Sequence, residues 1–372
     1  MKPEPDFPNV VSQFKFDGEF IRVEPYGFGH INDTYAAYFR KVDGGIHRSI
    51  MQRINHFVFK KPEELMANIW AVTSYLRKII IGNGGDPDRE TLTLIPTYQG
   101  EVFYRTEAGY YWRAYIFIEN AHTYQIPESS IHVYNAAGAY GHFQQLLADY
   151  PADQLYETIP DFHNTAKRFN TFLKTIEKDE YNRAQGVKAE IDFVLQHAGE
   201  MPILVDSIDQ GRLPVRVTHN DTKFNNVMID DDNGEGICVI DLDTVMPGSL
   251  LYDFGDAIRS ITNTAEEDER NLEIVHFDLD TYRAFTQGYL EAVLESITPE
   301  EIKNLVFSAR LMTLECGMRF LTDYLNGDVY FRTKRENHNL DRCRTQFKLI
   351  EEMEEQFDTM NVIVSNKVEG RS

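Results

Sequence analysis

Cysteine and positive charge are both scarce in this sequence, and each scarcity excludes a class of protein. There are three cysteines, Cys238, Cys316 and Cys343, which are far apart and match no metal-binding spacing. Their odd number makes a disulfide framework unexpected and favours a reducing compartment. Lys and Arg total 37 against 59 Asp and Glu, which gives a net charge of -22 at pH 7. Because no basic block interrupts the acidity, we expect neither nucleic acid nor an anionic membrane as a partner.

Long hydrophobic runs are also missing. No stretch approaches the roughly 20 apolar residues that a membrane helix requires, and the first residues do not follow a signal-peptide pattern. We therefore expect a soluble, cytoplasmic protein, as a monomer or weak homo-oligomer. The 372 residues exceed the length of about 250 to 300 residues at which single cores stop growing. Two lobes are expected.

Hydrophobic periodicity divides the chain into two parts. Strand-like runs dominate the first part and flank one amphipathic helix, whereas helical periodicity takes over after Ile118. The sequence therefore predicts a bilobal α+β fold, with a small antiparallel-sheet lobe at residues 1–118 and a mostly helical lobe at residues 119–372. The expected strands of the first lobe are 20–23, 34–39, 49–54, 91–95, 101–104 and 110–118, with a helix at 61–80. The expected helices of the second lobe are 129–148, 162–181, 187–198, 282–294, 299–325 and 342–357.

The most informative motif of the second lobe combines a histidine, two carboxylates and an amide. Asp221 follows His219 by two residues and precedes Asn226 by five, and Asp241 ends an apolar run that begins at Ile237. Kinase catalytic loops use such a pattern to place an aspartate beside the acceptor hydroxyl and to hold Mg²⁺ with an asparagine and a second aspartate. The motif therefore indicates a phosphotransferase that uses ATP and Mg²⁺.

Apolar runs around the motif place it between strands. Residues 215–217 lead into His219, and residues 227–229 lead into an acidic turn that contains glycine. We expect a hairpin that brings Asn226 and Asp241 to the same end of two paired strands. A surface loop rich in Asn and Asp is the alternative, although such loops rarely lie between apolar strands in this order.

Four segments of the sequence carry a family resemblance. They are residues 26–35 (YGFGHINDTY), 218–228 (THNDTKFNNVM), 239–248 (VIDLDTVMPG) and 252–256 (YDFGD). In this order they are similar to the aminoglycoside phosphotransferase-like superfamily, and within it most similar to the N-acetylhexosamine 1-kinases. The resemblance implies a protein-kinase-like fold and transfer of the ATP γ-phosphoryl group to the anomeric hydroxyl of GlcNAc or GalNAc.

The resemblance also implies roles for residues of the catalytic and metal loops. Asp221 matches the catalytic aspartate that accepts the proton of the sugar hydroxyl. Lys223 follows two residues later, where its charge is expected to offset charge on the transferring phosphoryl group, with an ordinary surface lysine as the alternative. Asn226 and Asp241 match the Mg²⁺ ligands. Asp243 would share a strand face with Asp241, as an outer or second metal ligand or as a carboxylate that ties down the loop.

Other polar residues are expected to support the catalytic loop. In this fold a histidine at the position of His219 more often orients the catalytic loop through hydrogen bonds than acts as an acid or base, so we expect a structural role for His219. Asp253 and Arg259 are expected to form a buried pair beneath the loop, with helix-surface charges as the alternative.

Nucleotide phosphates are expected to contact the first lobe. Gly27 and Gly29 stand at a strand-to-strand turn where bare backbone approaches phosphates, although an ordinary hairpin turn would look the same. Gln52 and Arg53 occupy the place of the strand lysine of protein kinases, so the residue that contacts the α and β phosphates departs from the kinase pattern. Glu64 on the following helix is the expected partner of Arg53, with a solvent-facing charge as an equally open alternative.

Residues 116–120 match the hinge between lobes. The resemblance implies that backbone groups of this segment, including those of Ile116 and Ile118, bind adenine. For the sugar it implies His30, Arg319 and Tyr330, together with Asp221. An arginine donor and an aromatic face suit hydroxyl and acetamido groups.

Three other functions remain open from the sequence. Asp241, Asp243 and Val245 fit the D-x-D-x-V signature of haloacid dehalogenase-type phosphatases, which normally opens a doubly wound domain near the amino terminus. A kinase-shaped binding module without activity is a second alternative, although it usually lacks the base, the amide or the metal aspartate. The third alternative keeps the chemistry and changes the acceptor to an aminoglycoside, an amino alcohol or another sugar.

Overall fold

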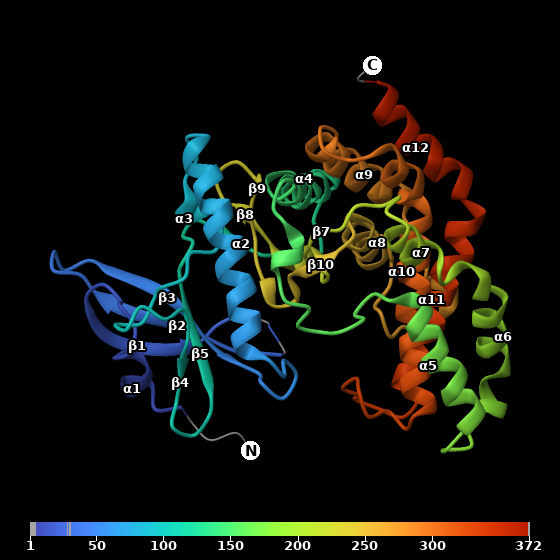
Figure 1. Ribbon diagram of the computed structural model, residues 1–372, viewed down its shortest axis with the longest axis horizontal. Coiled ribbons are helices and arrows are strands. Elements are labelled where there is room, and N and C mark those ends of the chain that lie inside the picture. The colour runs from blue at the N-terminus through green and yellow to red at the C-terminus, as the bar shows by residue number, and fades with distance from the viewer. Residues whose placement is uncertain (1–4, 28, 30, 371–372) are drawn as a thin grey trace.

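The first lobe of the computed structural model is built on a five-stranded antiparallel sheet (Figure 1). The structure describes residues 5–27, 29 and 31–370. The strand order is β1-β2-β3-β5-β4, so the first three strands form the meander expected from the sequence. The strands are β1 (Glu19–Pro25), β2 (Asp33–Arg40), β3 (Ile46–Ile54), β4 (Tyr104–Arg105) and β5 (Tyr111–Ile116), and a short helix, α1 (Phe7–Val11), precedes them.

One expected strand of the first lobe is wrong and another is shortened. Residues 91–95 make only an isolated bridge between Leu94 and Tyr115, because Pro96 lacks the N–H group that would continue a ladder. The run expected at residues 101–104 is reduced to the short strand β4, which pairs with the start of β5.

Helix α2 (Pro62–Gly82) lies between the sheet and the second lobe (Figure 1). Its apolar side chains recur at helical spacing, as the sequence predicts, and Leu65, Ile69, Val72 and Leu76 are all buried. They belong to a hydrophobic core that continues into the second lobe. A short helix, α3 (Pro87–Glu90), follows.

The second lobe is mostly helical and is centred on α10 (Pro299–Leu325), whose bounds agree with the sequence prediction. Thr298 and Glu301 form the expected capping box at its start. Helices α5, α8 and α11 pack against α10, and α4 packs along α9. The other helices are α4 (Ser130–Leu146), α5 (Thr165–Lys178), α6 (Lys188–Gln196), α7 (Ile203–Asp209), α8 (Leu250–Ile261), α9 (Leu279–Val293), α11 (His338–Glu355) and α12 (Phe357–Glu369).

Helices α7, α8 and α12 were not expected from the sequence. In α8 all residues from Leu250 to Arg259 are buried, including Asp253 and Asp256. A helix whose charged residues are buried does not show the polar face that periodicity arguments rely on. Asp253 of α8 instead accepts hydrogen bonds from the backbone N–H groups of His219 and Asn220.

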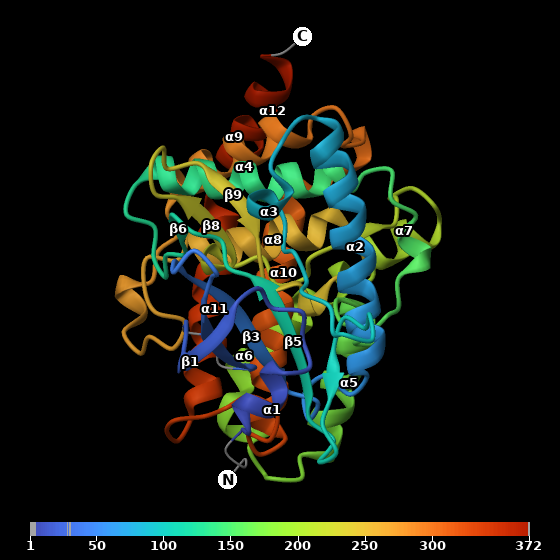
Figure 2. The ribbon, with the colours of Figure 1, turned by 90° about the vertical axis from the view of Figure 1, so that its left-hand side faces the viewer.

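Two small groups of strands occur between the helices and the first lobe. Strand β7 (Arg216–Thr218) pairs with β10 (Met246–Gly248), and β8 (Val227–Asp230) lies between β6 (Ala121–His122) and β9 (Gly236–Val239). Figure 2, seen from the side of the first lobe, shows β6, β8 and β9 above the large sheet. These strands carry the loops that hold the predicted catalytic and metal residues.

Within the part of the chain that the structure describes, no helix has both the length and the apolar composition needed to span a membrane.

Candidate active site

The β8–β9 hairpin brings Asn226 and Asp241 together, as predicted. The strands pair with Val227 opposite Val239, and the Ile240 N–H donates a hydrogen bond of 2.9 Å to the carbonyl of Asn226. Asn226 therefore precedes β8 at the same end of the hairpin at which Asp241 follows β9. The pairing of these strands is antiparallel, which contradicts the doubly wound parallel domain required by the phosphatase alternative.

Residues 219–226, between β7 and β8, form the candidate catalytic loop. This loop holds Asp221 beside a lysine and an amide. The Asp221 carboxylate pairs with the Lys223 ammonium at 2.7 Å, and the Asn226 side-chain NH₂ donates to the backbone carbonyl of Asp221 at 2.9 Å. The pKa of Lys223 is raised, chiefly by the Asp221 carboxylate, so the ammonium stays charged at neutral pH. The loop thus presents a carboxylate, a cation and an oriented amide within a few residues.

His219 is fully buried and links the two loops of the site. Its Nε2 lies 2.9 Å from the Ile240 carbonyl, and its Nδ1 accepts the Asp221 N–H at 3.2 Å. A neutral imidazole with its proton on Nε2 satisfies both contacts. His219 therefore joins the candidate catalytic loop to the segment that follows β9 through hydrogen bonds, as expected from the sequence.

Asp253 of α8 fixes the backbone of the candidate catalytic loop by accepting hydrogen bonds from it. Its carboxylate is 1% exposed and accepts the backbone N–H groups of His219 at 2.9 Å and Asn220 at 2.7 Å. It also accepts a bond of 2.7 Å from the Gln144 side chain. Burial raises the pKa of Asp253, while these three donors favour the charged form. Asn220, which is bonded in this way directly before Asp221, has a left-handed φ of 64°.

The expected pair between Asp253 and Arg259 is wrong. Arg259 instead pairs with Asp256 at 2.7 Å and reaches Glu267 at 3.5 Å. Residues three apart on a helix share a face, whereas residues six apart do not. Asp256 is therefore the partner that α8 offers, and Asp253 is left to bond the catalytic loop.

Asp241 lies near two other carboxylates, those of Asp243 and Asp221. The residue retains exposed surface and has a left-handed φ of 59°. Its pKa is raised to about 6, because protein atoms crowd the carboxylate and because Asp243 and Asp221 lie nearby. Among the described residues no group of three or more His, Cys, Asp or Glu side chains forms a metal site by itself.

Asp243 does not share a strand face with Asp241, so this expectation is wrong. Strand β9 ends at Val239, and Leu242–Thr244 is a 3₁₀ turn. Asp243 is 3% exposed. One carboxylate oxygen pairs with Arg113 of β5, and the other accepts a hydrogen bond of 2.5 Å from Asn32. Both oxygens therefore contact the first lobe.

Arg113 is a buried residue of the candidate site that the sequence reasoning missed. It is 1% exposed and donates from Nε to the Gln52 side-chain oxygen at 2.9 Å. Nearby carboxylates, Asp243 foremost, raise its pKa against the effect of burial. A lone arginine within the aromatic and apolar run of residues 110–118 was the signal, because a buried strand tolerates a charge only when the charge is paired.

Gln52 and Arg53, both predicted to bind nucleotide, point to opposite faces of β3. Gln52 bonds Thr34 at 3.0 Å and lies opposite Arg113 in the sheet. Arg53 pairs with Asp33 at 2.7 Å and lies over the Trp112 ring of β5. The partner given by the structure is thus Asp33 rather than Glu64, which pairs with Lys61.

The predicted phosphate and adenine contacts fall in the turn and hinge of the first lobe. Gly27 has a φ of 76°, which L side chains rarely adopt, and Gly29 is exposed. His30 lies outside the described residues. The Ile116 N–H is already bonded to the Thr93 carbonyl at 2.9 Å, so this group is not available to adenine. Ile118 is buried.

The structure brings Arg319 and Tyr330 to the same aromatic cluster. The Arg319 guanidinium lies 5.6 Å from the centroid of the Phe331 ring, and the Tyr330 ring meets Phe331 edge to face at 4.8 Å. Arg319 also lies over Phe162 and pairs with Glu315 at 3.7 Å. Tyr330 is 66% exposed and thus presents a free aromatic surface.

Asp323 of α10 fixes the loop that carries Tyr330. Its carboxylate accepts the backbone N–H groups of Val329, Tyr330 and Phe331 at 3.0, 2.8 and 2.9 Å. The Asn339 side chain donates a fourth bond at 2.8 Å. The loop is therefore held through its backbone. Sequence reasoning missed Asp323 because its partners follow the helix by several residues.

Charged residues of α8 interact electrostatically both with Lys223 and with Cys316 of α10. Lys223 pairs with Asp221 and also interacts with Asp256. Asp256 pairs with Arg259, and the positive charges of Arg259 and Arg319 partly offset the effect of burial, which raises the pKa of the Cys316 thiol. Helix α8 therefore packs against both the loop that carries Asp221 and helix α10, which carries Arg319.

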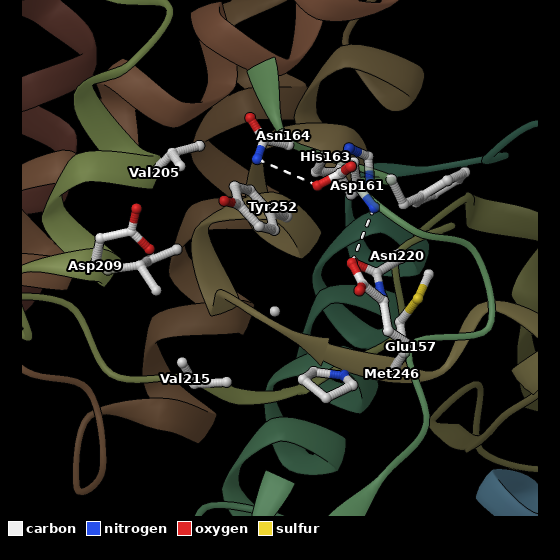
Figure 3. Close-up of a pocket in the computed structure, with 14 residues that line it drawn as sticks. Glu157, Asp161, His163, Asn164, Val205, Asp209, Val215, Asn220, Met246 and Tyr252 are labelled. Atoms are coloured by element: carbon white, nitrogen blue, oxygen red, sulfur yellow. Dashed lines mark hydrogen bonds between the residues drawn. The ribbon is translucent and has the colours of Figure 1, made fainter. Parts of the chain in front are cut away.

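A cavity of about 240 Å³ lies beside the catalytic loop (Figure 3). Its wall includes Asn220, the neighbour of Asp221, and Tyr252 of α8. Of the residues predicted to bind phosphate, metal or sugar, those that the structure describes do not line it. We therefore place the candidate site around Asp221 and not in this cavity. Figure 3 shows Val205, Asp209 and Val215 on one side, with Asn220, Glu157 and Met246 facing them.

Known proteins share both the sequence pattern and the fold. A model of the phosphotransferase enzyme family matches residues 97–285. The chain is similar to an aminoglycoside phosphotransferase from Alicyclobacillus acidocaldarius, with a TM-score of 0.64 and 13% identity over 98% of both chains. It is also similar to an amicoumacin kinase in complex with AMP-PNP, Ca²⁺ and Ami, with a TM-score of 0.57 and 11% identity over 94% of this chain and 92% of that chain.

A further similar structure is a microcompartment-associated aminopropanol kinase. Its TM-score is 0.56, with 11% identity over 96% of this chain and 98% of that chain. At these identities the likeness concerns the fold. It confirms the α+β arrangement of a small antiparallel-sheet lobe and a mostly helical lobe that the resemblance implied.

Proposed function

Because this chain belongs to the phosphotransferase enzyme family, we propose that it transfers the γ-phosphoryl group of ATP to the anomeric hydroxyl of an N-acetylhexosamine. The observation that carries this proposal is the convergence of Asp221, Lys223, Asn226 and Asp241 at one end of the β8–β9 hairpin. A base, a cation and two oxygen ligands are what phosphoryl transfer to an alcohol requires.

Asp221 is proposed to orient the acceptor hydroxyl and to take its proton. Phosphoryl transfer has a loose transition state, so the base contributes mainly by position. Three contacts fix that position: the Asp221 N–H bonds His219, its carbonyl bonds Asn226, and its carboxylate pairs with Lys223. Lys223 would stabilise the negative charge on the transferring phosphoryl oxygens.

Asn226 and Asp241 are proposed to hold Mg²⁺. The Asn226 NH₂ group is used in the bond to Asp221, which leaves the amide oxygen as the ligand. Burial, together with the nearby Asp243 and Asp221 carboxylates, raises the pKa of Asp241, and a bound divalent cation would stabilise its charged form. Mg²⁺ is usually bound by one or two carboxylates together with phosphates and water, which fits a site without a larger acidic cluster. Bound Mg²⁺ supplies charge neutralisation at the β and γ phosphates. Asp243 is an outer neighbour of this site.

Arg319 and Tyr330 support an N-acetylhexosamine as the acceptor. Arginine donates to hydroxyl and acetamido oxygens, and an exposed aromatic ring offers a face for the sugar. Arg319 and Tyr330 meet at Phe331. Helix α10, which carries Arg319, packs against α8, whose Asp256 interacts electrostatically with Lys223. His30 remains a prediction of the sequence.

ATP consumption over a panel of acceptors tests the proposal. The panel contains GlcNAc, GalNAc, plain hexoses, aminoglycosides and amino alcohols, each with and without Mg²⁺. We expect turnover with the N-acetylhexosamines, and ³¹P NMR should identify the 1-phosphate. A 6-phosphate product would refute the proposed regiochemistry. Preferred turnover of an aminoglycoside or amino alcohol would keep the phosphotransferase and replace the acceptor.

A further inference from the structure

Asp243 contacts the first lobe at two independent points. Its two carboxylate oxygens receive the Arg113 guanidinium from β5 and the Asn32 side-chain NH₂ from the residue before β2. Arg113 and Asp243 are 1% and 3% exposed, so water does not screen their attraction. Asp243 belongs to the loop that follows β9, two residues beyond Asp241. This loop is thus attached directly to the sheet of the other lobe.

Asn32 passes this attachment on to the connection between β1 and β2. Its side-chain oxygen accepts the Asn55 N–H at 2.9 Å, and the Asn55 side chain donates to the Ile31 carbonyl at 3.1 Å. The amide of Asn32 therefore bonds Asp243 on one side and the end of β3 on the other. The connection that contains Gly27 and Gly29 is held at its last residue by the loop that carries Asp241.

Helix α2 is attached to the second lobe by a separate contact. Asn68 is 1% exposed and donates both amide protons, to the carbonyls of Tyr156 at 2.8 Å and Val245 at 2.9 Å. Its oxygen accepts the Tyr156 N–H at 2.8 Å. In protein kinases a strand lysine pairs with a glutamate of the corresponding helix. Here Arg113, a buried basic side chain of β5, pairs across the lobes with Asp243 instead.

We propose that Asn32, Arg113 and Asp243 form an interlobe clasp that sets the β1–β2 connection against Asp241 and thereby positions the nucleotide phosphates. Asp243 is then a positioning residue that acts through Asn32 and Arg113. The inference rests on the proposed function, because it assumes that phosphates bind between the β1–β2 connection and Asp241. The clasp itself is a property of the free chain and can be measured without substrate.

The first experiment changes Asn32→Asp in the full chain. This variant keeps the side-chain size and the oxygen that accepts the Asn55 N–H, but it turns the donor toward Asp243 into a second carboxylate oxygen. Two facing carboxylates repel. We expect the KM for Mg-ATP to rise about tenfold, a change of about 1.4 kcal/mol, while the KM for the acceptor stays within about twofold of the wild type.

Hydrogen–deuterium exchange on the free chain provides the second readout. Peptides that contain residues 31–34 and 241–246 should exchange faster in Asn32→Asp than in the wild type. The control is Asn271→Asp, which adds the same charge at an exposed helix cap, where aspartate still accepts the Glu273 N–H. The control should match the wild type in both measurements. Unchanged exchange and an unchanged KM in Asn32→Asp would overturn the clasp.

A comparison of Asp243→Asn with Asp241→Asn separates positioning from metal binding. Asp241→Asn should raise the Mg²⁺ concentration needed for half-maximal activity, because it removes a charged ligand. Asp243→Asn should raise the KM for Mg-ATP and leave that concentration close to the wild-type value. An equal increase in both variants would make Asp243 a metal ligand and refute its positioning role. If Asp243→Asn loses its native circular dichroism, the Asn32→Asp measurements alone decide. If the wild-type chain phosphorylates no acceptor, the proposed function fails, and the exchange measurement still tests the clasp.

Discussion

Replacing Asp253 with asparagine should destabilise the fold moderately and damage catalysis severely. The carboxylate accepts three hydrogen bonds, from the His219 and Asn220 N–H groups and from Gln144. Asparagine offers one acceptor oxygen, so at least one buried N–H group then faces an NH₂ group. The unpaired donor and the weaker hydrogen bonds to an uncharged acceptor together lower the free energy of unfolding by about 2 to 5 kcal/mol. Removing a buried charge offsets part of this cost, as the raised pKa of Asp253 indicates, and leaves a net loss of about 1 to 3 kcal/mol.

The catalytic effect of Asp253→Asn should exceed the effect on stability. Asn220 needs its bond to Asp253 to keep a left-handed backbone directly before Asp221. A shift of about 1 Å at a catalytic group can cost about 100-fold in rate. Thermal unfolding by circular dichroism and steady-state kinetics below the melting temperature measure the two effects separately.

Asp278→Asn is the matched control for that experiment. Asp278 also accepts backbone N–H groups, from Asp280 and Thr281, but it caps α9 at a partly exposed position. Asparagine caps helices about as well as aspartate, so stability and kcat should stay near wild type. A fully active Asp253→Asn variant would refute the view that this carboxylate positions the catalytic loop.

Two other changes have expected outcomes of different kinds. Asp221→Asn should keep nearly all Mg-ATP binding in calorimetry and lower kcat by about 10²- to 10⁴-fold; full activity would remove Asp221 from its role as base. Gly288→Ala should lower the free energy of unfolding by about 1 to 3 kcal/mol, because the added methyl group would overlap the Tyr134 carbonyl where α4 packs on α9. Its control is Gly138→Ala at the same interface, where the added methyl carbon would lie 4.0 Å from its nearest neighbour, the Gly288 carbonyl oxygen. A stable Gly288→Ala variant would contradict the close approach of these helices.

Local patterns in the sequence were sufficient for the catalytic hairpin. Asn226 and Asp241 flank two short apolar runs joined by an acidic turn, and the register of antiparallel strands then determines that both residues lie at one end. Helix α10 was also predictable at both ends, because Thr298 and Glu301 mark its start and its apolar positions recur to Leu325. These features depend on neighbours in the chain.

Pairs of charged residues from distant elements could not be predicted in the same way. Arg53 was expected to meet Glu64 and meets Asp33, and Arg259 was expected to meet Asp253 and meets Asp256. With 37 basic and 59 acidic residues, charge alone leaves many combinations open, and the sheet register or helix face decides among them. Arg113 is the clearest case, because its partner lies 130 residues away in the other lobe.

The anchoring of the Tyr330 loop by Asp323 has a consequence for how recognition can diverge. Four N–H donors meet one carboxylate, and three of them come from the main chain. The side chains of Val329 and Tyr330, which are 74% and 66% exposed, can therefore be exchanged while the path of the peptide is retained. Descendants of this protein could acquire a new preference for small molecules by altering these outward groups, with the phosphoryl-transfer machinery left untouched.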